Sequence, residues 1–280
     1  MKTKVVMTAP FNTRSGYGDH ARSLFYSIMD REDLQIKCID TKWGETPRNH
    51  LKEEVPRHKK LLDVLSMDTN LDYRPDIYID IRIPNEYAQV GKCNIGITAG
   101  VETDIVSPEF IEGCNKMNFN IVPSKFTSKT FLGTIYDKTE EKNGQKIKMG
   151  EHKVTKPMMV LGEGVDVDVY KPFDVNDNRT KFTDDLDDML KEENFVYLHV
   201  GLWGKGGYGE DRKNITLMIK TFLETFSNTP KENMPALLLK TNGSDFSVLD
   251  KHDTKKRAMS IINQFEGMDV PNICLLYTSP

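Results

Sequence analysis

The sequence predicts an α/β protein with two Rossmann-like, doubly wound parallel-sheet domains, of which the second is incomplete. Short apolar strands alternate with longer amphipathic helices along most of the chain. A polar stretch at 137–156 interrupts this alternation, and a run rich in Asp and Lys between 175 and 193 separates a first alternating run from a second. Strands separated by helices of this length indicate parallel pairing with right-handed crossovers.

The first alternating run covers residues 1–175. Strands are expected at 4–8, 34–39, 77–83, 94–98, 119–122 and 158–161, and helices at 18–29, 108–117 and 125–135. The charged stretch 50–66 carries a leucine stripe that Pro56 is expected to interrupt. Residues 137–156 are almost wholly polar and contain Asn143-Gly144, which predicts a surface hairpin inserted near the end of this domain.

The second run begins after a predicted linker at 176–193 and covers residues 194–280. Strands are expected at 195–200, 236–241 and 273–276, and helices at 215–226 and 254–265. A doubly wound domain usually needs about 150 residues, more than this run supplies. The final letters, CLLYTSP, follow a strand directly and resemble translated sequencing adapter from a metagenomic assembly. We therefore expect the chain to be a fragment.

Composition excludes several functional classes. The 38 Lys and Arg residues against 42 Asp and Glu residues leave a net charge of -4, which argues against broad binding to nucleic acid or anionic lipid. No apolar run reaches the roughly 18 residues that span a bilayer, and the N-terminus MKTKVVMTAP is not a signal peptide. Four widely spaced cysteines without a CxxC pair predict reduced, mostly buried thiols. We expect a cytoplasmic protein without a transmembrane segment.

Ligands of open parallel sheets bind at the carboxyl ends of the strands, so the residues after each strand are candidates. After the first strand, Gly16 and Gly18 permit a tight turn from which a helix directs N–H groups toward phosphate or sugar oxygens. His20, in the first helical turn, is expected to face the same cleft. The spacing differs from GxGxxG, which disfavours a nicotinamide or flavin cofactor. A plain strand-to-helix turn fits this segment equally well.

Two carboxylates, Glu102 and Asp104, follow the strand at 94–98 and can hydrogen-bond sugar hydroxyls or act as a general base. A solvated turn is the alternative interpretation. Ser124 stands where the N-cap of the next helix is expected.

The glycine-rich loop that begins at Gly201 carries Arg212 and Lys213 to the start of a helix. Two cations at a helix N-terminus suit a diphosphate, although an exposed basic turn has the same pattern. The loop is not a Walker A sequence. His199, inside the preceding strand, is interpreted as a satisfied core histidine. No cluster has the spacing of zinc ligands and no GxSxG elbow is present, so we expect neither a metal site nor a hydrolase nucleophile.

Five segments, in this order, resemble the retaining glycosyltransferases of the GT-B fold, in the large family-four group. They are SGYGDHAR, GVETD, NFNIVPSKFTSKTF, LGEGVDVDVYKP and VGLWGKGGYGEDRKNITLMIKTFLETF. The resemblance covers nearly the whole chain. It implies that the N-terminal domain binds a glycan, lipid-linked or protein acceptor and that the C-terminal domain binds a nucleotide-diphosphate sugar. It also implies transfer with retention and without a metal or other cofactor.

The resemblance implies roles for individual residues. Lys213 matches the lysine that contacts the donor diphosphate, and Arg212 replaces an arginine whose usual position here holds Leu202 or Trp203. Gly201 lies on the same donor loop. Glu102 matches an acidic position near the acceptor pocket and is, with Lys213, the expected catalytic residue.

The other matches are on the acceptor side, where the resemblance implies roles for His20, Asp104 and Ser124. Gly16 and Gly18 match a glycine-rich acceptor or phosphate loop. The family also has a paired-glutamate motif that grips the donor sugar, and the resemblance implies that its position would follow the last residue of this sequence. A nucleotide-sugar epimerase on the same scaffold and a non-catalytic nucleotide- or sugar-binding module are the alternative functions.

Overall fold

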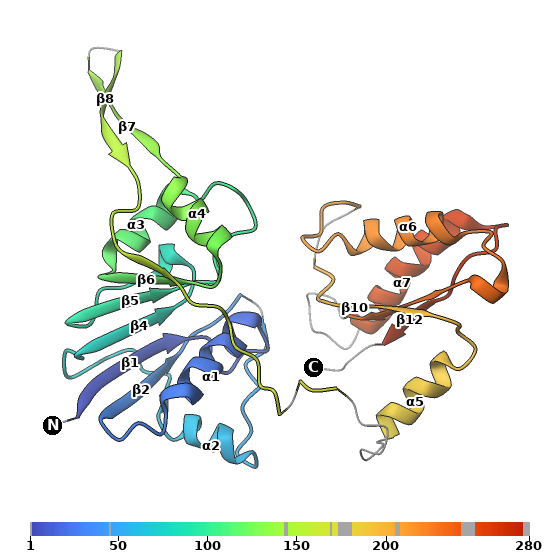
Figure 1. The fold of residues 1–280 in the computed structure, drawn as a ribbon, viewed down its shortest axis with the longest axis horizontal. Helices are drawn as coiled ribbons and strands as arrows, with labels where there is room; N and C mark the ends of the chain where they lie inside the picture. The colour runs from blue at the N-terminus through green and yellow to red at the C-terminus, as the bar shows by residue number, and fades with distance from the viewer. Residues whose placement is uncertain are drawn as a thin grey trace. The chain divides into compact units, whose positions relative to one another are not determined.

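The computed structural model describes residues 2–44, 46–142, 145–168, 170–172, 181–204, 208–241 and 250–276. Contacts divide the chain into two compact units, Met1–Tyr170 and Lys171–Pro280, each of which is described by itself (Figure 1). Parts of the expected linker, of the hairpin turn at Asn143-Gly144 and of the final letters lie outside the described residues.

A parallel sheet forms the first unit. Within the described residues its strands are β1 (Thr3–Ala9), β2 (Leu34–Asp40), β3 (Leu65–Ser66), β4 (Ile77–Ile81), β5 (Cys93–Ile97), β6 (Phe119–Val122) and β9 (Met158–Val160). Their order is β3-β2-β1-β4-β5-β6-β9, and every pairing is parallel. The strand order therefore reverses at β1, as the predicted doubly wound sheet requires.

The helices of this unit are α1 (Gly16–Ile28), α2 (Pro56–Leu62), α3 (Pro108–Lys116) and α4 (Lys125–Gly133), with a 3₁₀ turn at Pro84–Glu86. The main core joins buried side chains of β1, such as Met7, to Phe25 of α1 and Leu61 of α2. The sequence suggested that Pro56 interrupts the charged stretch, but in the structure Pro56 begins α2. The first helical position suits proline because its missing N–H group has no intrahelical partner there.

The polar insertion forms an antiparallel pair, β7 (Tyr136–Lys142) and β8 (Gln145–His152), as the Asn143-Gly144 signal predicted. Figure 1 shows this pair projecting away from the parallel sheet of the first unit.

The second unit contains α5 (Lys181–Leu190), β10 (Val196–Val200), α6 (Ile215–Phe226), β11 (Ala236–Lys240), α7 (Asp250–Ile262) and β12 (Ile273–Leu276), with 3₁₀ turns at Lys231–Asn233 and Asn263–Phe265. The described strands pair in the order β10-β11-β12, all parallel. Trp203, Ile219 and Leu239 lie in the core shared by α6, α7 and the sheet. No helix in the described part of either unit is long and apolar enough to cross a membrane.

Candidate functional site

The start of α1 is closed by its own cap. Ser15 Oγ accepts the N–H of Gly18 at 3.1 Å and lies 2.7 Å from Thr13 Oγ1. Gly16 and Gly18 are therefore inside the helix, and neither has a positive φ. The predicted glycine turn is wrong, because a serine cap begins the helix two residues earlier than expected. Gly18 packs closely on the segment before the helix, because an added Cβ would lie 2.5 Å from the Thr13 carbonyl oxygen.

His20 lies beside a carboxylate that sequence reasoning did not connect with it. Its Nδ1 is 3.7 Å from Glu163 Oε1, and 12% of the His20 side chain is exposed. Burial lowers the pKa of His20, and the charge of Glu163 opposes that shift. Arg57 of α2 ties the same segment to the unit through Asp166 Oδ2 at 2.5 Å.

Glu102 and Asp104 lie exposed in the segment between β5 and α3. Gly100, with a φ of 90°, turns this segment so closely against Thr127 of α4 that no Cβ would fit. Ser124 caps α4 as predicted, because its Oγ accepts the Thr127 N–H at 3.0 Å. Ser124 and the two carboxylates thus belong to neighbouring segments at the carboxyl ends of β5 and β6.

The turn before α6 carries Arg212 and Lys213, both exposed, as the sequence predicted. Asn214 follows with a left-handed φ of 51° and leads into the helix. Gly201 continues the sheet, since its N–H donates to the Lys240 carbonyl at 3.1 Å. Residues 205–207 of the glycine-rich loop lie outside the described residues.

Asp211 is a site residue that sequence reasoning missed. It is 1% exposed, and its Oδ2 accepts the N–H of Ile215, the first residue of α6, at 2.9 Å. A carboxylate is favoured there because the helix N-terminus carries partial positive charge. The N–H group of Ile215 is therefore already bonded and is not open to a ligand. This differs from the expectation that the N-terminus of this helix binds a diphosphate. The sequence does contain a signal for this cap, since an aspartate shortly before an apolar helix is typical of a helix N-terminus.

Two buried polar atoms at this helix start lack partners. Asp211 Oδ1 and His199 Nε2 have no hydrogen bond among the described residues. His199 is therefore not the satisfied core histidine that the sequence suggested. Its pKa is lowered by burial and by nearby Lys213, against the opposing charge of Asp211. A cavity of about 540 Å³ borders both His199 and Lys213. The ammonium group of Lys213 is exposed at this cavity, whereas the unpaired atoms of Asp211 and His199 are buried beneath it.

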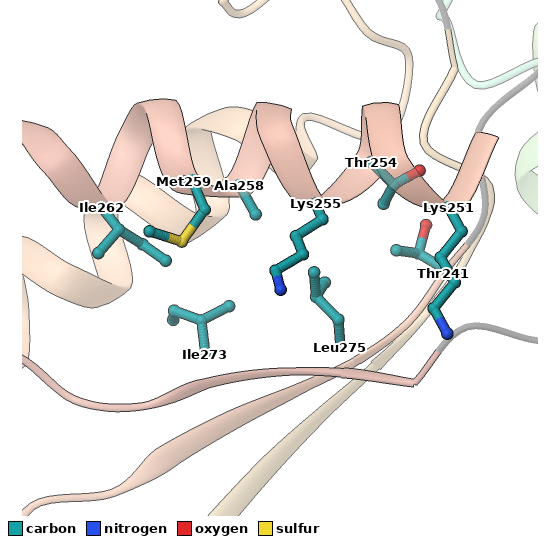
Figure 2. A pocket seen from close by; sticks show the side chains of 9 residues that line it. All are labelled: Thr241, Lys251, Thr254, Lys255, Ala258, Met259, Ile262, Ile273 and Leu275. Carbon is teal, nitrogen blue, oxygen red and sulfur yellow. The ribbon is translucent and has the colours of Figure 1, made fainter. Parts of the chain in front are cut away.

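A second cavity of the same unit, of about 320 Å³, lies between α7 and β12. Figure 2 shows Lys251 and Lys255 extending from α7 beside Thr241 and Thr254, over an apolar floor of Ile273 and Leu275. Thr241 directly follows β11, so this cavity also reaches the carboxyl edge of the sheet. Within the described ranges, no three His, Cys, Asp or Glu side chains are grouped so as to hold a metal ion.

Comparisons with solved structures identify proteins of similar fold. The HepE protein of Anabaena, in complex with UDP and glucose, aligns with a TM-score of 0.52 and 12% identity over 99% of this chain and 70% of its own. The α,α-trehalose-phosphate synthase (UDP-forming) of Burkholderia xenovorans, in complex with glucose-6-phosphate, aligns with a TM-score of 0.54 and 11% identity. That alignment covers 100% of this chain and 75% of the synthase.

The similarity confirms the predicted α/β, GT-B fold class, and at this level of identity it concerns the fold alone. No protein-family model matches the sequence, and the search of curated proteins finds no match.

Proposed function

We propose that this chain is a glycosyltransferase that takes a sugar from a nucleotide-diphosphate sugar. The sugar passes, with retention, to a glycan, lipid-linked or protein acceptor. The observation that carries the proposal is the start of α6, where exposed Arg212 and Lys213 lie beside the unpaired buried atoms of Asp211 and His199. The fold shared with proteins solved with UDP and glucose, or named as UDP-forming synthases, supports it.

The proposed chemistry follows from the charge that develops in the reaction. The leaving diphosphate gains negative charge as the bond from its oxygen to the anomeric carbon breaks. We expect Lys213 and Arg212 to stabilise this charge, the kind of electrostatic effect that is often the largest catalytic contribution. In this proposal the two cations compensate the diphosphate, and no metal ion takes part.

On the acceptor side, the proposal assigns Glu102 to the acceptor hydroxyl, with Asp104, His20 and Ser124 at the same edge of the first unit. Gly18 contributes close packing, because its N–H group is already bonded to Ser15. We place the reaction in the cytoplasm, where free thiols such as buried Cys38 and Cys114 stay reduced, although Cys93 is exposed.

The test is the substitution Lys213→Ala. Calorimetry with UDP- and GDP-sugars should show much weaker donor binding, and in a chain that includes the paired-glutamate motif kcat/KM for transfer should fall about 100-fold or more. Lys220→Ala is the matched control, because Lys220 lies on α6, the helix that follows Lys213, and pairs with Glu224. Unchanged turnover in Lys213→Ala contradicts the assignment.

The same assay separates the alternative functions. A nucleotide-sugar epimerase would convert the donor without an acceptor, and a binding module would bind the donor without forming product.

A further inference from the structure

Two aromatic rings are stacked at the carboxyl edge of the sheet in the first unit. Trp43, in the segment after β2, lies on Tyr17 of α1 with ring centroids 4.2 Å apart and planes tilted by 31°. The Tyr17 hydroxyl is 2.8 Å from Thr98 Oγ1 and accepts the Ala99 N–H at 3.1 Å, which fixes the ring to the end of β5. Both rings remain partly exposed.

A buried network joins the segment before Tyr17 to the one that carries Trp43. Asp40, 5% exposed, accepts the Asn12 N–H at 3.0 Å and the Arg48 Nη2 at 2.5 Å. Asn12 also donates to the Arg48 carbonyl at 3.0 Å and accepts the Leu51 N–H at 2.9 Å. The ring pair is therefore held in place before any ligand binds, which reduces the ordering cost of binding.

The position of the ring pair is that of a ligand site. β1 lies between β2 and β4, and open sheets bind ligands at the carboxyl edge where the strand order reverses. The hydroxyl of Thr98 lies beside the Tyr17 hydroxyl, and Arg14, three positions before Tyr17 in the chain, is exposed. A partly exposed aromatic face with a polar surround suits a ligand that is apolar on one face and polar at its rim.

A pyranose ring has this chemistry, because its C–H groups gather on one face while its hydroxyls point outward around the ring. We propose that Trp43, supported by Tyr17, is a stacking platform for a pyranose ring of the acceptor. The assignment of that ring to the acceptor rests on the proposed function. Among the acceptor classes named above, the platform selects a carbohydrate.

The two tryptophans of the chain allow a direct test. Trp203 is 0% exposed, so Trp203→Phe leaves Trp43 as the reporter, and the unmodified chain serves as a check on that variant. Maltose should change the Trp43 emission in a saturable way. Mannitol, which has hydroxyls but no ring face, should not.

Calorimetry with maltose extends the test to variants. Trp43→Ala should weaken binding roughly tenfold, and Trp43→Phe should restore part of the loss. Tyr73→Ala is the matched control and should have no effect, because Tyr73 contacts Lys4 near the start of β1, at the opposite edge of the sheet.

An equal response to maltose and mannitol, or unchanged maltose affinity in Trp43→Ala, overturns the platform. Binding of UDP and of GDP is measured on the same chain. Maltose binding at Trp43 without binding of either nucleotide supports the platform and contradicts the proposed function. Binding of either nucleotide without any saccharide response at Trp43 overturns the platform alone.

Discussion

In each unit the first strand is followed by a polar segment and a helix, yet the two helix starts are built differently. At α1, Ser15 caps the helix and the buried Arg22 donates to the carbonyls of Phe11 and Thr13 at 2.5 and 2.8 Å. At α6, the cap is a buried carboxylate, and two exposed cations stand beside it. The first start satisfies its polar groups internally, whereas the second combines exposed basic side chains with buried polar atoms that lack hydrogen-bond partners among the described residues.

The first strands of the units differ in the same way. β1 is paired on both sides, and most of its side chains are buried. β10 pairs only with β11 among the described strands, and Leu198 and Val200 are more than half exposed. Both strands are largely apolar in sequence, so composition alone does not decide their burial.

The largest expected effect on stability concerns Gly18. In Gly18→Ala the new methyl group meets the Thr13 carbonyl at 2.5 Å, and we expect a loss of about 3 kcal/mol in the free energy of unfolding. Gly16 is also helical, but a Cβ added there would have no atom within 4 Å. Gly16→Ala should therefore raise the free energy of unfolding by up to about 1 kcal/mol. Urea unfolding followed by Trp43 emission in Trp203→Phe measures both. Equal effects would show that α1 does not pack closely on Thr13.

The two caps should differ in strength. Asp211→Ala removes a charged acceptor from α6 and should cost about 2 kcal/mol, whereas Ser15→Ala at α1 should cost about 1 kcal/mol. Asp211→Asn keeps an acceptor oxygen and should lose less than the alanine variant. Each unit holds one tryptophan, so emission from Trp203 and Trp43 follows the two unfolding transitions separately. A larger loss for Ser15→Ala would reverse the comparison.

The smallest effect is a pH dependence near the start of α1. Burial, followed by the charge of Arg22, lowers the pKa of His50 from 6.5 to about 4, with Asp19 opposing and His58 and Arg14 adding to the shift. The folded-state pKa lies below the unfolded one, so the neutral form contributes stability above about pH 6.5 that is lost as pH falls toward 4. His50 is half-buried and screened by solvent, so we expect less than about 1 kcal/mol.

The pH dependence is checked by measuring the free energy of unfolding of the first unit between pH 7 and pH 4, with Trp43 emission as the probe. His50→Gln should flatten part of the acid-side loss. An identical pH profile in wild type and variant would remove His50 as its source.

Sequence reasoning anticipated the sheets better than the sites. The alternation of apolar and amphipathic segments predicted most strands and helices, and Ser124 was identified as a cap from its place before an amphipathic run. The start of α1 was misplaced because Ser15, a strong cap, stands beside glycines that also suit a turn. Asp211 carried a readable capping signal, whereas the stacking of Trp43 on Tyr17 had none, since their segments meet only in the fold.

The sequence by itself determined the succession of strands and helices, since apolar periodicity is a local property of the chain. It also placed Arg212 and Lys213 at a helix start, because the order of residues along the chain decides that. Only the tertiary structure decided which polar groups find partners. Ser15 and Arg22 are satisfied by neighbouring loop atoms, while Asp211 Oδ1 and His199 Nε2 are not. Such partners come from segments that meet when the sheet forms, and a local pattern carries no record of them.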